Sequence, residues 1–346
     1  MDCELVKQGF EQGSCQVFDF TEGRLRKACE ATLKYEQGVP YRLINAVFLS
    51  RPEHYLSIYQ SGCNLSCKKC HSWRFTQNAV GEWMSPYDVA KEVARYLNDY
   101  EITFVPREHA TSWHAHELCK SCGSCVMHGK RNKQCPGILG IDRIELSPQG
   151  WGPARNIIAF TGGDLTCQPD FYVKSAELIK GLNENVWVLL ETNGYGLTPN
   201  TLDSFQQAGI DSFWLDIKAY EDEVHRRLTG VSNPRILKLP EELKERGVVF
   251  EVLSLCIPGW VETDQIGNIA MELASVDTEI PFTILAFFPE YKMRDVHTPT
   301  LRQMIDAYNA AKDAGLRKIK LGNVHLFVHT REEYETLEKI VGREGL

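Results

Sequence analysis

Three cysteines, Cys63, Cys67 and Cys70, stand close together in the run Gly-Cys-Asn-Leu-Ser-Cys-Lys-Lys-Cys-His, which ends at His71. Three thiolates suit a [4Fe–4S] cluster, which has four iron corners, and they leave one corner without a protein ligand. An open corner indicates that another molecule binds there, as an open position on zinc marks a catalytic site. The sequence therefore predicts a reactive iron–sulfur centre at this loop.

A single metal ion is the main alternative for these cysteines. Zinc could take the three thiolates with His71 as a fourth ligand, although zinc sites favour paired x2 spacings over x3 followed by x2. Disulfides fit less well, because cysteines three or four residues apart on a tight loop make poor bridges and nothing in the chain suggests secretion. Cluster and zinc both stay open on the spacing alone.

The CxxxCxxC run follows a predicted strand, 55–60, and this combination resembles the radical S-adenosylmethionine (SAM) superfamily. The resemblance implies that the methionine part of SAM occupies the open iron corner. It also implies that reductive cleavage of SAM produces a 5′-deoxyadenosyl radical, which abstracts hydrogen from a substrate. The expected protein is an oxygen-sensitive oxidoreductase.

Composition restricts the class of protein further. The chain has 346 residues, 43% of them hydrophobic, enough for one large α/β domain or two smaller ones. Without a run of 18 apolar residues or a signal-like start, we expect a cytoplasmic protein with no membrane partner. Twelve cysteines in that compartment indicate metal or redox chemistry. The net charge of −8 gives no support to nucleic-acid binding.

From residue 55 onward, apolar strands alternate with amphipathic helices, which predicts βαβ units with parallel pairing. Alternation alone does not separate a barrel from a doubly wound sheet, whereas the resemblance implies a partial (β/α)6 TIM-type barrel. Either fold puts functional residues in the loops after the strands. Six strands are predicted at 55–60, 156–160, 186–190, 212–217, 248–255 and 282–287, with a further apolar piece at 319–321. Helices are predicted at 85–100, 169–182, 199–208, 221–229, 240–246, 263–275, 300–314 and from about 330.

The chain divides into four predicted parts. These are an N-terminal extension at 1–50, a radical SAM partial barrel at 51–324, a cysteine-rich insert at 101–152 within it, and a C-terminal helix at 325–346. In the extension we expect a helix around 21–33 and a strand at 46–49.

The loop after the second predicted strand reads Thr161-Gly162-Gly163-Asp164. Two glycines allow the backbone to approach a ligand closely, and the acid beside them can pair with an ammonium group. Alone, such a turn is a common way to leave a strand. After a cysteine loop it resembles the Gly-Gly-Glu motif that holds the amino group of SAM, with a shorter acid and with Leu165 where proline is common.

The next two strands end in charged and amide residues. Glu191 and Asn193 follow the third strand and suit ribose hydroxyls or a bound cation, while Asp216 and Lys218 share one face at the end of the fourth. An ordinary ion pair at the barrel mouth explains the latter two equally well. The resemblance implies that these residues line the SAM pocket, and Asp216 and Lys218 are also our candidates for catalytic residues.

Over about residues 55–324, the chain resembles one branch of the superfamily more specifically. Asp-Ile-Lys followed by Leu-Thr-Gly-Val-Ser-Asn at 228–233 is similar to the activating enzymes of glycyl radical enzymes. Ala-Phe-Phe-Pro-Glu-Tyr-Lys-Met at 286–293 resembles the AmmeMemoRadiSam relatives. Two positions depart from the pattern: Phe288 replaces a histidine, and Lys69 stands where an aromatic residue usually precedes the third cysteine.

The insert carries four more cysteines in ferredoxin-like order: Cys119, Cys122, Cys125 and Cys135. The x2, x2 start and the final Cys-Pro match the bacterial ferredoxin run, although nine residues replace the usual three before the last cysteine. Four thiolates fit one closed [4Fe–4S] cluster, and zinc is a serious alternative because four cysteines suit a tetrahedral ion. Some glycyl radical activases resemble this chain in carrying such an insert at this place.

The remaining cysteines and histidines are interpreted more simply. Cys3, Cys15 and Cys29 are scattered and are expected to be ordinary thiols. Cys167 is expected to be a buried inert thiol, with a substrate-facing role as its alternative. His109, His114 and His116 are spaced irregularly and are expected on the surface.

Three functional hypotheses follow. The first is hydrogen abstraction from a glycine of a partner protein, with electrons from a flavodoxin- or ferredoxin-type donor. The basic segment 120–134 could dock such a donor. The second is radical SAM chemistry on another protein residue, a peptide or a small metabolite. The third is a non-catalytic iron–sulfur or zinc protein that transfers electrons or acts as a scaffold.

Overall fold

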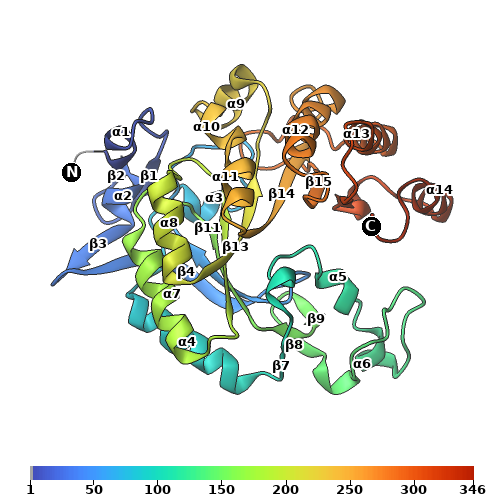
Figure 1. The fold of residues 1–346 in the computed structure, drawn as a ribbon, viewed down its shortest axis with the longest axis horizontal. Helices are drawn as coiled ribbons and strands as arrows, with labels where there is room; N and C mark the ends of the chain where they lie inside the picture. The colour runs from blue at the N-terminus through green and yellow to red at the C-terminus, as the bar shows by residue number, and fades with distance from the viewer. Residues whose placement is uncertain (1–2) are drawn as a thin grey trace.

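Seven parallel strands form the centre of the sheet in the computed structural model, which describes residues 3–346 (Figure 1). Each neighbours the next in chain order, so every crossover returns to an adjacent strand. They are β5 (Leu56–Gln60), β11 (Ile157–Gly162), β12 (Trp187–Thr192), β13 (Ile210–Asp216), β14 (Val249–Cys256), β15 (Phe282–Ala286) and β16 (Ile319–Gly322). The six predicted strands are confirmed, and the apolar piece at 319–321 is a seventh.

The sheet is an open partial barrel within the described residues. At one edge lies β16, and beyond β5 the antiparallel strands β4 (Val39–Leu49) and β3 (Leu33–Glu36) continue the sheet, with β6 (Glu82–Met84) also paired to β4. The partial barrel expected from the resemblance is therefore confirmed, and two strands of the N-terminal extension belong to its sheet.

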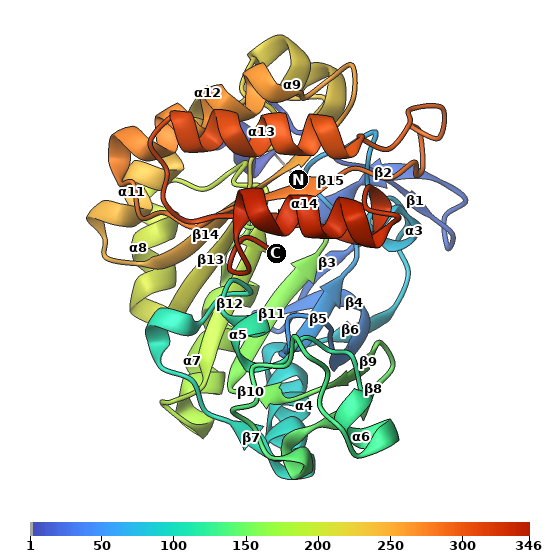
Figure 2. The ribbon, with the colours of Figure 1, turned by 90° about the vertical axis from the view of Figure 1, so that its right-hand side faces the viewer.

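Helices cover the outside of the parallel strands (Figures 1 and 2). Their starts follow the local chemistry: Ser85 and Asp88 form a capping box ahead of α4, and Thr300 and Gln303 do the same for α13. The helices are α4 (Pro86–Asp99), α7 (Asp170–Leu182), α8 (Pro199–Ala208), α9 (Asp222–Thr229), α10 (Pro234–Leu237), α11 (Leu239–Glu245), α12 (Thr263–Val276), α13 (Leu301–Asp313) and α14 (Arg331–Val341). Among residues 3–346, no helix combines the length and apolar character needed to cross a bilayer.

The N-terminal extension differs from its prediction. Only 28–31 of the helix expected at 21–33 is helical; the part before it is wrong, because Gly23 lies in the left-handed region at φ 65° and turns the chain back into a hairpin. The elements here are α1 (Glu4–Lys7), β1 (Gln16–Asp19), β2 (Arg24–Lys27) and α2 (Ala28–Ala31). The strand expected at 46–49 is the last part of the longer β4.

The insert between α4 and β11 lies at the amino end of the barrel (Figure 2). The short elements of this region are β7 (Ile102–Thr103), η1 (Arg107–His109), α5 (Ala115–Leu118), α6 (Ser124–His128), η2 (Ile141–Arg143), β8 (Glu145–Ser147), β9 (Gly150–Gly152) and β10 (Ala154–Arg155). Arg51 attaches the β8–β9 hairpin, because its guanidinium donates to the carbonyl oxygens of Glu145, Gly150, Gly152 and Pro153 at 2.8–3.3 Å.

A fully buried arginine connects separate segments of the chain at the amino end of the barrel. Arg155 is 0% exposed, and its guanidinium donates to the carbonyl oxygens of Glu53, His109 and Thr111 at 2.6–3.1 Å. It thereby joins the residues before β5 to the first turn of the insert.

Replacing Arg155 with Met should lower the free energy of unfolding by about 3 kcal/mol, because each buried carbonyl left without a donor costs about 1–3 kcal/mol. Urea unfolding measures the loss, and faster hydrogen exchange at 107–111 would locate it. Arg302→Met is the matched control, since the Arg302 side chain is 84% exposed and pairs with Asp306 alone. Equal effects of the two substitutions would contradict the assigned role.

Candidate active site

The predicted site residues meet at one cavity of about 430 Å³ inside the barrel mouth. This volume lies in the range of small-molecule sites, roughly 300–1,000 Å³. Every residue predicted for the catalytic cysteine loop and the SAM pocket lines it except Gly163, which packs behind Gly162. The lining includes Cys63, Cys67, Cys70, Gly162, Asp164, Glu191, Asn193, Asp216 and Lys218.

The three thiols are spread around the cavity. Within residues 3–346, no three ligand atoms from Cys63, Cys67, Cys70 and His71 lie within 4.8 Å of one another. A single tetrahedral zinc with bonds of about 2.3 Å would hold its sulfur ligands about 3.8 Å apart. A cluster does not require its ligands to be so close, because they bind different iron corners.

Burial raises the pKa of all three thiols, and that of Cys67 reaches about 12. The ammonium group of Lys218 opposes the effect at Cys67 and Cys70. Metal binding needs thiolates, so it must release protons from this loop.

The Gly-Gly turn packs against the cysteine loop. Gly163 donates its amide to the carbonyl of Gln60 at 2.7 Å, and a Cβ on Gly163 would lie 2.1 Å from the carbonyl oxygen of Gly62. A Cβ on Gly162 would meet the ring of Phe75 at 2.6 Å. Close approach to the protein's own backbone thus accounts for the glycine at 163.

Asp164 links the ends of β11 and β12. Its side chain is 4% exposed, and its carboxylate accepts hydrogen bonds from the Thr192 hydroxyl and from the amides of Thr166 and Asn193 at 2.7–2.9 Å. Its backbone carbonyl accepts from the amide of Asn64, next to Cys63. Pairing of Asp164 with the ammonium of SAM stays a prediction, and the contacts show a positioning role.

Glu191 and Asn193 point in different directions. The Glu191 carboxylate accepts from the hydroxyls of Tyr55 and Thr161 inside the barrel. Asn193 faces the cysteine loop, where its amide donates to Asn64 Oδ1 at 2.8 Å and approaches Cys63 Sγ at 3.7 Å.

Asp216 and Lys218 form an ion pair at the cavity. Burial acts to lower the pKa of Lys218, but the Asp216 carboxylate and the neighbouring thiols outweigh it and raise that pKa. The other Asp216 oxygen, Oδ1, is buried without a hydrogen-bond partner. An acceptor left free in a cavity-lining carboxylate is suited to a ligand's donor or to a cation.

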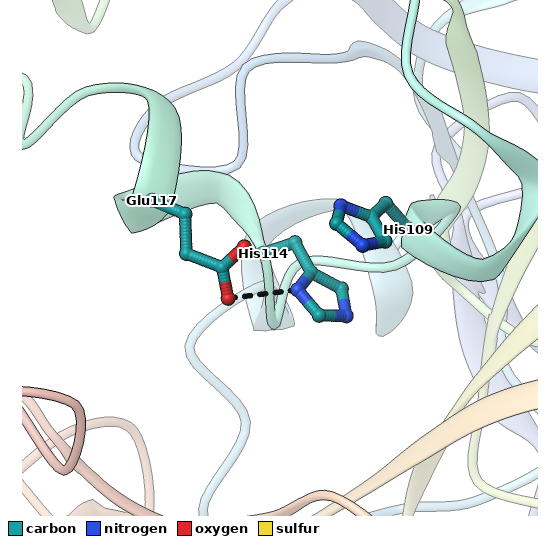
Figure 3. A group of neighbouring side chains, drawn as sticks. All are labelled: His109, His114 and Glu117. Atoms are coloured by element: carbon teal, nitrogen blue, oxygen red, sulfur yellow. Dashed lines mark hydrogen bonds and ion pairs between the residues drawn. The ribbon is translucent and has the colours of Figure 1, made fainter. Parts of the chain in front are cut away.

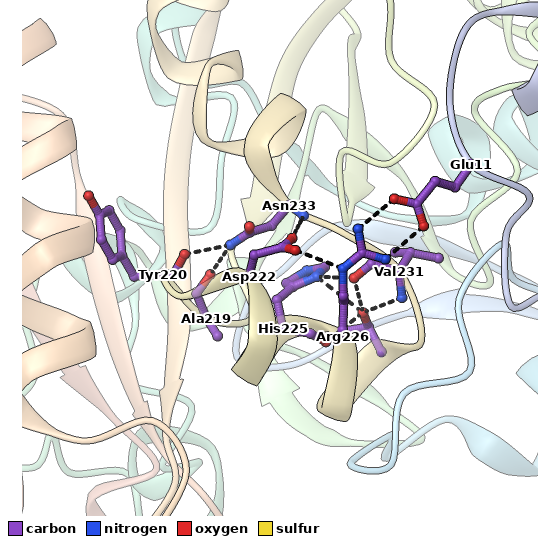
Figure 4. A network of polar contacts seen from close by, with 9 residues as sticks. Glu11, Ala219, Tyr220, Asp222, His225, Arg226, Val231 and Asn233 are labelled. Atoms are coloured by element: carbon purple, nitrogen blue, oxygen red, sulfur yellow. Dashed lines mark hydrogen bonds and ion pairs between the residues drawn. The ribbon is translucent and has the colours of Figure 1, made fainter.

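The Leu-Thr-Gly-Val-Ser-Asn segment fixes the loop after Lys218 (Figure 4). The Asn233 side chain donates to the carbonyls of Ala219 and Tyr220 at 2.8 and 2.7 Å, and its amide donates to Asp222 at 2.9 Å. Its role here is to position the chain that follows the ion pair.

Sequence reasoning missed a cation in this cavity. Lys69 is 7% exposed, its Nζ has no hydrogen-bond partner, and it lies 3.2 Å from the centre of the Phe288 ring. Burial lowers its pKa to about 8. Lys69 and Phe288, the two positions that depart from the family pattern, are thus in contact. The sequence alone does not predict this contact.

The N-terminal extension also reaches the site. The Ser14 hydroxyl accepts from the amide of Ser66 at 2.8 Å and donates to the carbonyl of Thr229 at 2.6 Å. Nearby, Glu11 pairs with Arg226 through two contacts of 2.6 and 2.7 Å (Figure 4). Residues 11–14 therefore hold the cysteine loop from outside, and no sequence motif signals it.

The second cysteine set lies elsewhere. Cys119, Cys122, Cys125 and Cys135 line one pocket in the insert, and no three of their sulfurs lie within 4.8 Å of one another among the described residues. The carbonyl of Cys119 lies 3.1 Å from His54 Nε2, ahead of β5, whereas Cys63 follows the end of β5. The two sets are separated by roughly the length of that strand, about 16 Å at about 3.3 Å per residue.

His109, His114 and Glu117 place ligand atoms within 4.8 Å of one another (Figure 3). His114 Nδ1 is 2.8 Å from the Glu117 carboxylate, and the two imidazoles stack at 3.7 Å. The group is accounted for as a hydrogen bond and a ring stack near the surface, with Glu117 exposed.

Substitution of Gly163 by Ala should lower stability by about 3 kcal/mol and reduce the iron bound at the catalytic loop, because a Cβ has no room beside Gly62. Iron analysis and urea unfolding measure the two effects. Gly181→Ala in α7 is the control, since its Cβ would meet open space and should stabilise the helix by about 0.5–1 kcal/mol. Unchanged iron content in the Gly163 variant would refute the packing argument.

Glu191 should make stability depend on pH. Burial raises its pKa from 4.5 to about 8, so between these values the unfolded chain loses a proton that the folded protein keeps. Its contribution to stability therefore falls as pH rises through this window. Glu191→Gln should gain stability relative to the wild type from about pH 5 to about pH 8 and then level off. Urea unfolding at several pH values tests this, with the half-exposed Glu335→Gln as control; the opposite trend would contradict it.

Comparison with known proteins supports the family resemblance. A sequence model described as the Radical SAM superfamily matches residues 141–270. The match covers the Gly-Gly turn, Glu191, Asn193 and the Asp216–Lys218 pair, and the cysteine loop at 63–70 lies outside it.

Two of the curated relatives are named as activating enzymes of other enzymes. The pyruvate formate-lyase 1-activating enzyme of Escherichia coli K12 is 25% identical over 167 residues, covering 43% of this chain and 68% of that protein. The 4-hydroxyphenylacetate decarboxylase activating enzyme of Clostridium scatologenes is 27% identical over 209 residues, covering 55% and 62%.

Among solved structures, Streptococcus suis SuiB bound to the precursor peptide SuiA superposes with a TM-score of 0.51 at 14% identity, covering 84% of this chain and 52% of that one. This likeness concerns the fold. Residues 141–270 are thus similar to the radical SAM superfamily in sequence, and the superposition adds a similarity of fold.

Proposed function

We propose that this protein is a cytoplasmic, oxygen-sensitive radical SAM enzyme that cleaves SAM and abstracts hydrogen from a glycine of a partner protein. The observation that carries the proposal is the single cavity in which three cysteines face the polar ends of the neighbouring parallel strands. Ligand sites at the carboxyl ends of parallel strands are the rule for barrel enzymes.

The residues present fit both cofactors. Cys63, Cys67 and Cys70 would hold a [4Fe–4S] cluster, because all three thiols line the one cavity and would leave one iron corner open to a ligand. Asp216, with its free Oδ1, and Lys218 would contact the polar groups of SAM, and Glu191 would line the far side. When bound, the cluster supplies the single electron that splits SAM into methionine and the 5′-deoxyadenosyl radical.

The chain's own groups would orient SAM and exclude water. Trp73 on α3 (Trp73–Thr76) stacks on Tyr291 and donates to Glu290 at 2.9 Å, so the loop after β15 is fastened over the cysteine loop. The amide of Lys292 also donates to the carbonyl of Lys68 at 3.2 Å. A covered site protects a reactive radical from side reactions.

We further assign a second [4Fe–4S] cluster to Cys119, Cys122, Cys125 and Cys135. Their ferredoxin-like order along the chain and their place around one pocket support a cluster. Lys130, Arg131 and Lys133 are exposed beside it and suit the docking of an acidic flavodoxin- or ferredoxin-type donor.

The named activities of the curated relatives support a partner protein as substrate. A second candidate is a small or peptide substrate with an anionic group, and Lys69 favours it. A buried ammonium without a hydrogen-bond partner at the cavity could bind a carboxylate or phosphate.

Anaerobic reconstitution with iron and sulfide, followed by dithionite and SAM, tests the proposal. We expect 5′-deoxyadenosine, and a glycyl radical signal by electron paramagnetic resonance when the partner enzyme is added. Deoxyadenosine without a glycyl signal on any glycyl radical enzyme of the same genome would favour the second candidate. A protein that neither binds nor cleaves SAM would be a carrier or scaffold, and the proposal would fail.

Cys67→Ala should reduce deoxyadenosine formation at least about 100-fold, because the catalytic cluster loses one of its three ligands. Product analysis by chromatography after dithionite reduction measures it. Cys256→Ala is the matched control, since Cys256 is 2% exposed at the end of β14 and belongs to no ligand set. Wild-type rates in the Cys67 variant would show that the ligand assignment is wrong.

A further inference from the structure

Four cysteines that no motif connects come together in the fold: Cys3, Cys15, Cys29 and Cys167. Three come from the N-terminal extension, and the fourth follows the Gly-Gly-Asp turn. None is predicted as a ligand from sequence, because they are 12, 14 and 138 residues apart along the chain. All four are free thiols.

Contacts bring their backbones to one place. The amide of Ala28, next to Cys29, donates to the carbonyl of Cys15 at 2.7 Å. Cys15 and Cys29 belong to the same apolar cluster as Leu165, two residues before Cys167. The hairpin β1–β2 and helix α2 thus rest against the loop that follows β11.

Helix α1 lies on the other side of the four cysteines. Cys3 is the N-cap residue of α1, and Gln8 just after that helix donates its side-chain amide to the carbonyl of Cys167 at 3.2 Å. A Cβ on Gly196 would contact both Cys167 and Leu5 of α1, at 2.7 and 2.8 Å. The helix that Cys3 caps therefore lies against Cys167.

Electrostatics agrees with this placement. Burial raises the pKa of Cys15, Cys29 and Cys167, and the charge of the neighbouring thiols raises each pKa further, with Cys3 acting on all three. Lys27 acts in the opposite direction on Cys15 and Cys29. The same mutual influence exists at the insert, where Cys122, Cys125 and Cys135 raise the pKa of Cys119.

The chemistry of such a group points to a metal. Cys15 and Cys167 are 7% and 4% exposed, and four cysteines gathered at one place are a complete set of thiolate ligands for a [4Fe–4S] cluster. Within the described residues, no three of these sulfurs lie within 4.8 Å of one another, whereas a single zinc would hold them about 3.8 Å apart, so the arrangement gives no support to zinc. The same holds for the catalytic and insert sets.

We propose that Cys3, Cys15, Cys29 and Cys167 are the four ligands of a further [4Fe–4S] cluster, which joins the N-terminal extension to the barrel. The centre borders the active site, because Cys167 follows Asp164 by three residues and the Asp164 carbonyl accepts from Asn64, beside Cys63. It does not rest on the proposed function, because its ligands are separate from the SAM cavity.

Iron counting on the anaerobically reconstituted full chain tests the proposal. The double variant Cys15→Ala/Cys29→Ala should bind about four fewer irons than the wild type, about eight in place of about twelve when all three cysteine sets hold clusters, because only two thiolates remain for the cluster. Cys256→Ala should match the wild type, since that buried thiol lies outside all three sets. Equal iron in wild type and the double variant would overturn the proposal.

A second variant guards against misfolding of the first. Alanine at all seven other candidate ligands, with the four cysteines retained, should still bind about four irons and give a [4Fe–4S] Mössbauer spectrum. Folded protein without iron, or with one zinc in its place, would overturn the assignment. Loss of deoxyadenosine formation with unchanged iron would count against the proposed function and leave this centre intact.

Discussion

The structure of the active site depends on one close backbone contact, between the cysteine loop and the Gly-Gly turn. Gly163 donates to Gln60 at 2.7 Å, and Asn64 donates back to Asp164 at 2.8 Å, so the loops after β5 and β11 are bound at both ends. The Asp164 carboxylate extends this connection to Thr192 and Asn193 on β12. Three neighbouring strands are thereby locked together where the thiols must stand, and that rigidity is what a cluster loop requires.

The charged groups around the cavity agree with this arrangement of the loops. Burial makes the thiols of Cys63, Cys67 and Cys70 poor acids, and the nearby cations Lys218 and Lys69 lie on the cavity wall where an anionic cluster would bind. Lys218 is paired with Asp216, whereas Lys69 Nζ has no hydrogen-bond partner among the described residues and lies against the rings of Phe287 and Phe288. The cavity therefore has one compensated cation and one available for a ligand.

Local pattern was enough to predict the parallel strands, most helices and the motifs at the strand ends, because apolar alternation and caps such as Ser85 are written in adjacent residues. It failed where long-range packing decides. Gly23 turns the expected helix at 21–33 into a hairpin, and Lys69 meets Phe288 from 219 residues away. Asp164 illustrates the limit within the site: its position at the cavity was predictable, but its hydrogen bonds from Thr192 and Asn193 at the end of β12 were not.

The first part of the N-terminal extension, from α1 to α2, and the insert lie at opposite ends of the barrel (Figure 1). Cys119 lies beside His54, before β5 begins, whereas Ser14 contacts Ser66 within the cysteine loop. Any electron entering at the insert must cross roughly the length of β5, but the extension touches the cysteine loop directly. Because Ser14 immediately precedes Cys15, the segment that holds the cysteine loop also supplies a thiol to the proposed third centre. The extension is thus part of the structure that holds the cysteine loop, and the proposed centre to which it contributes three cysteines would lie nearer to that loop than the insert does.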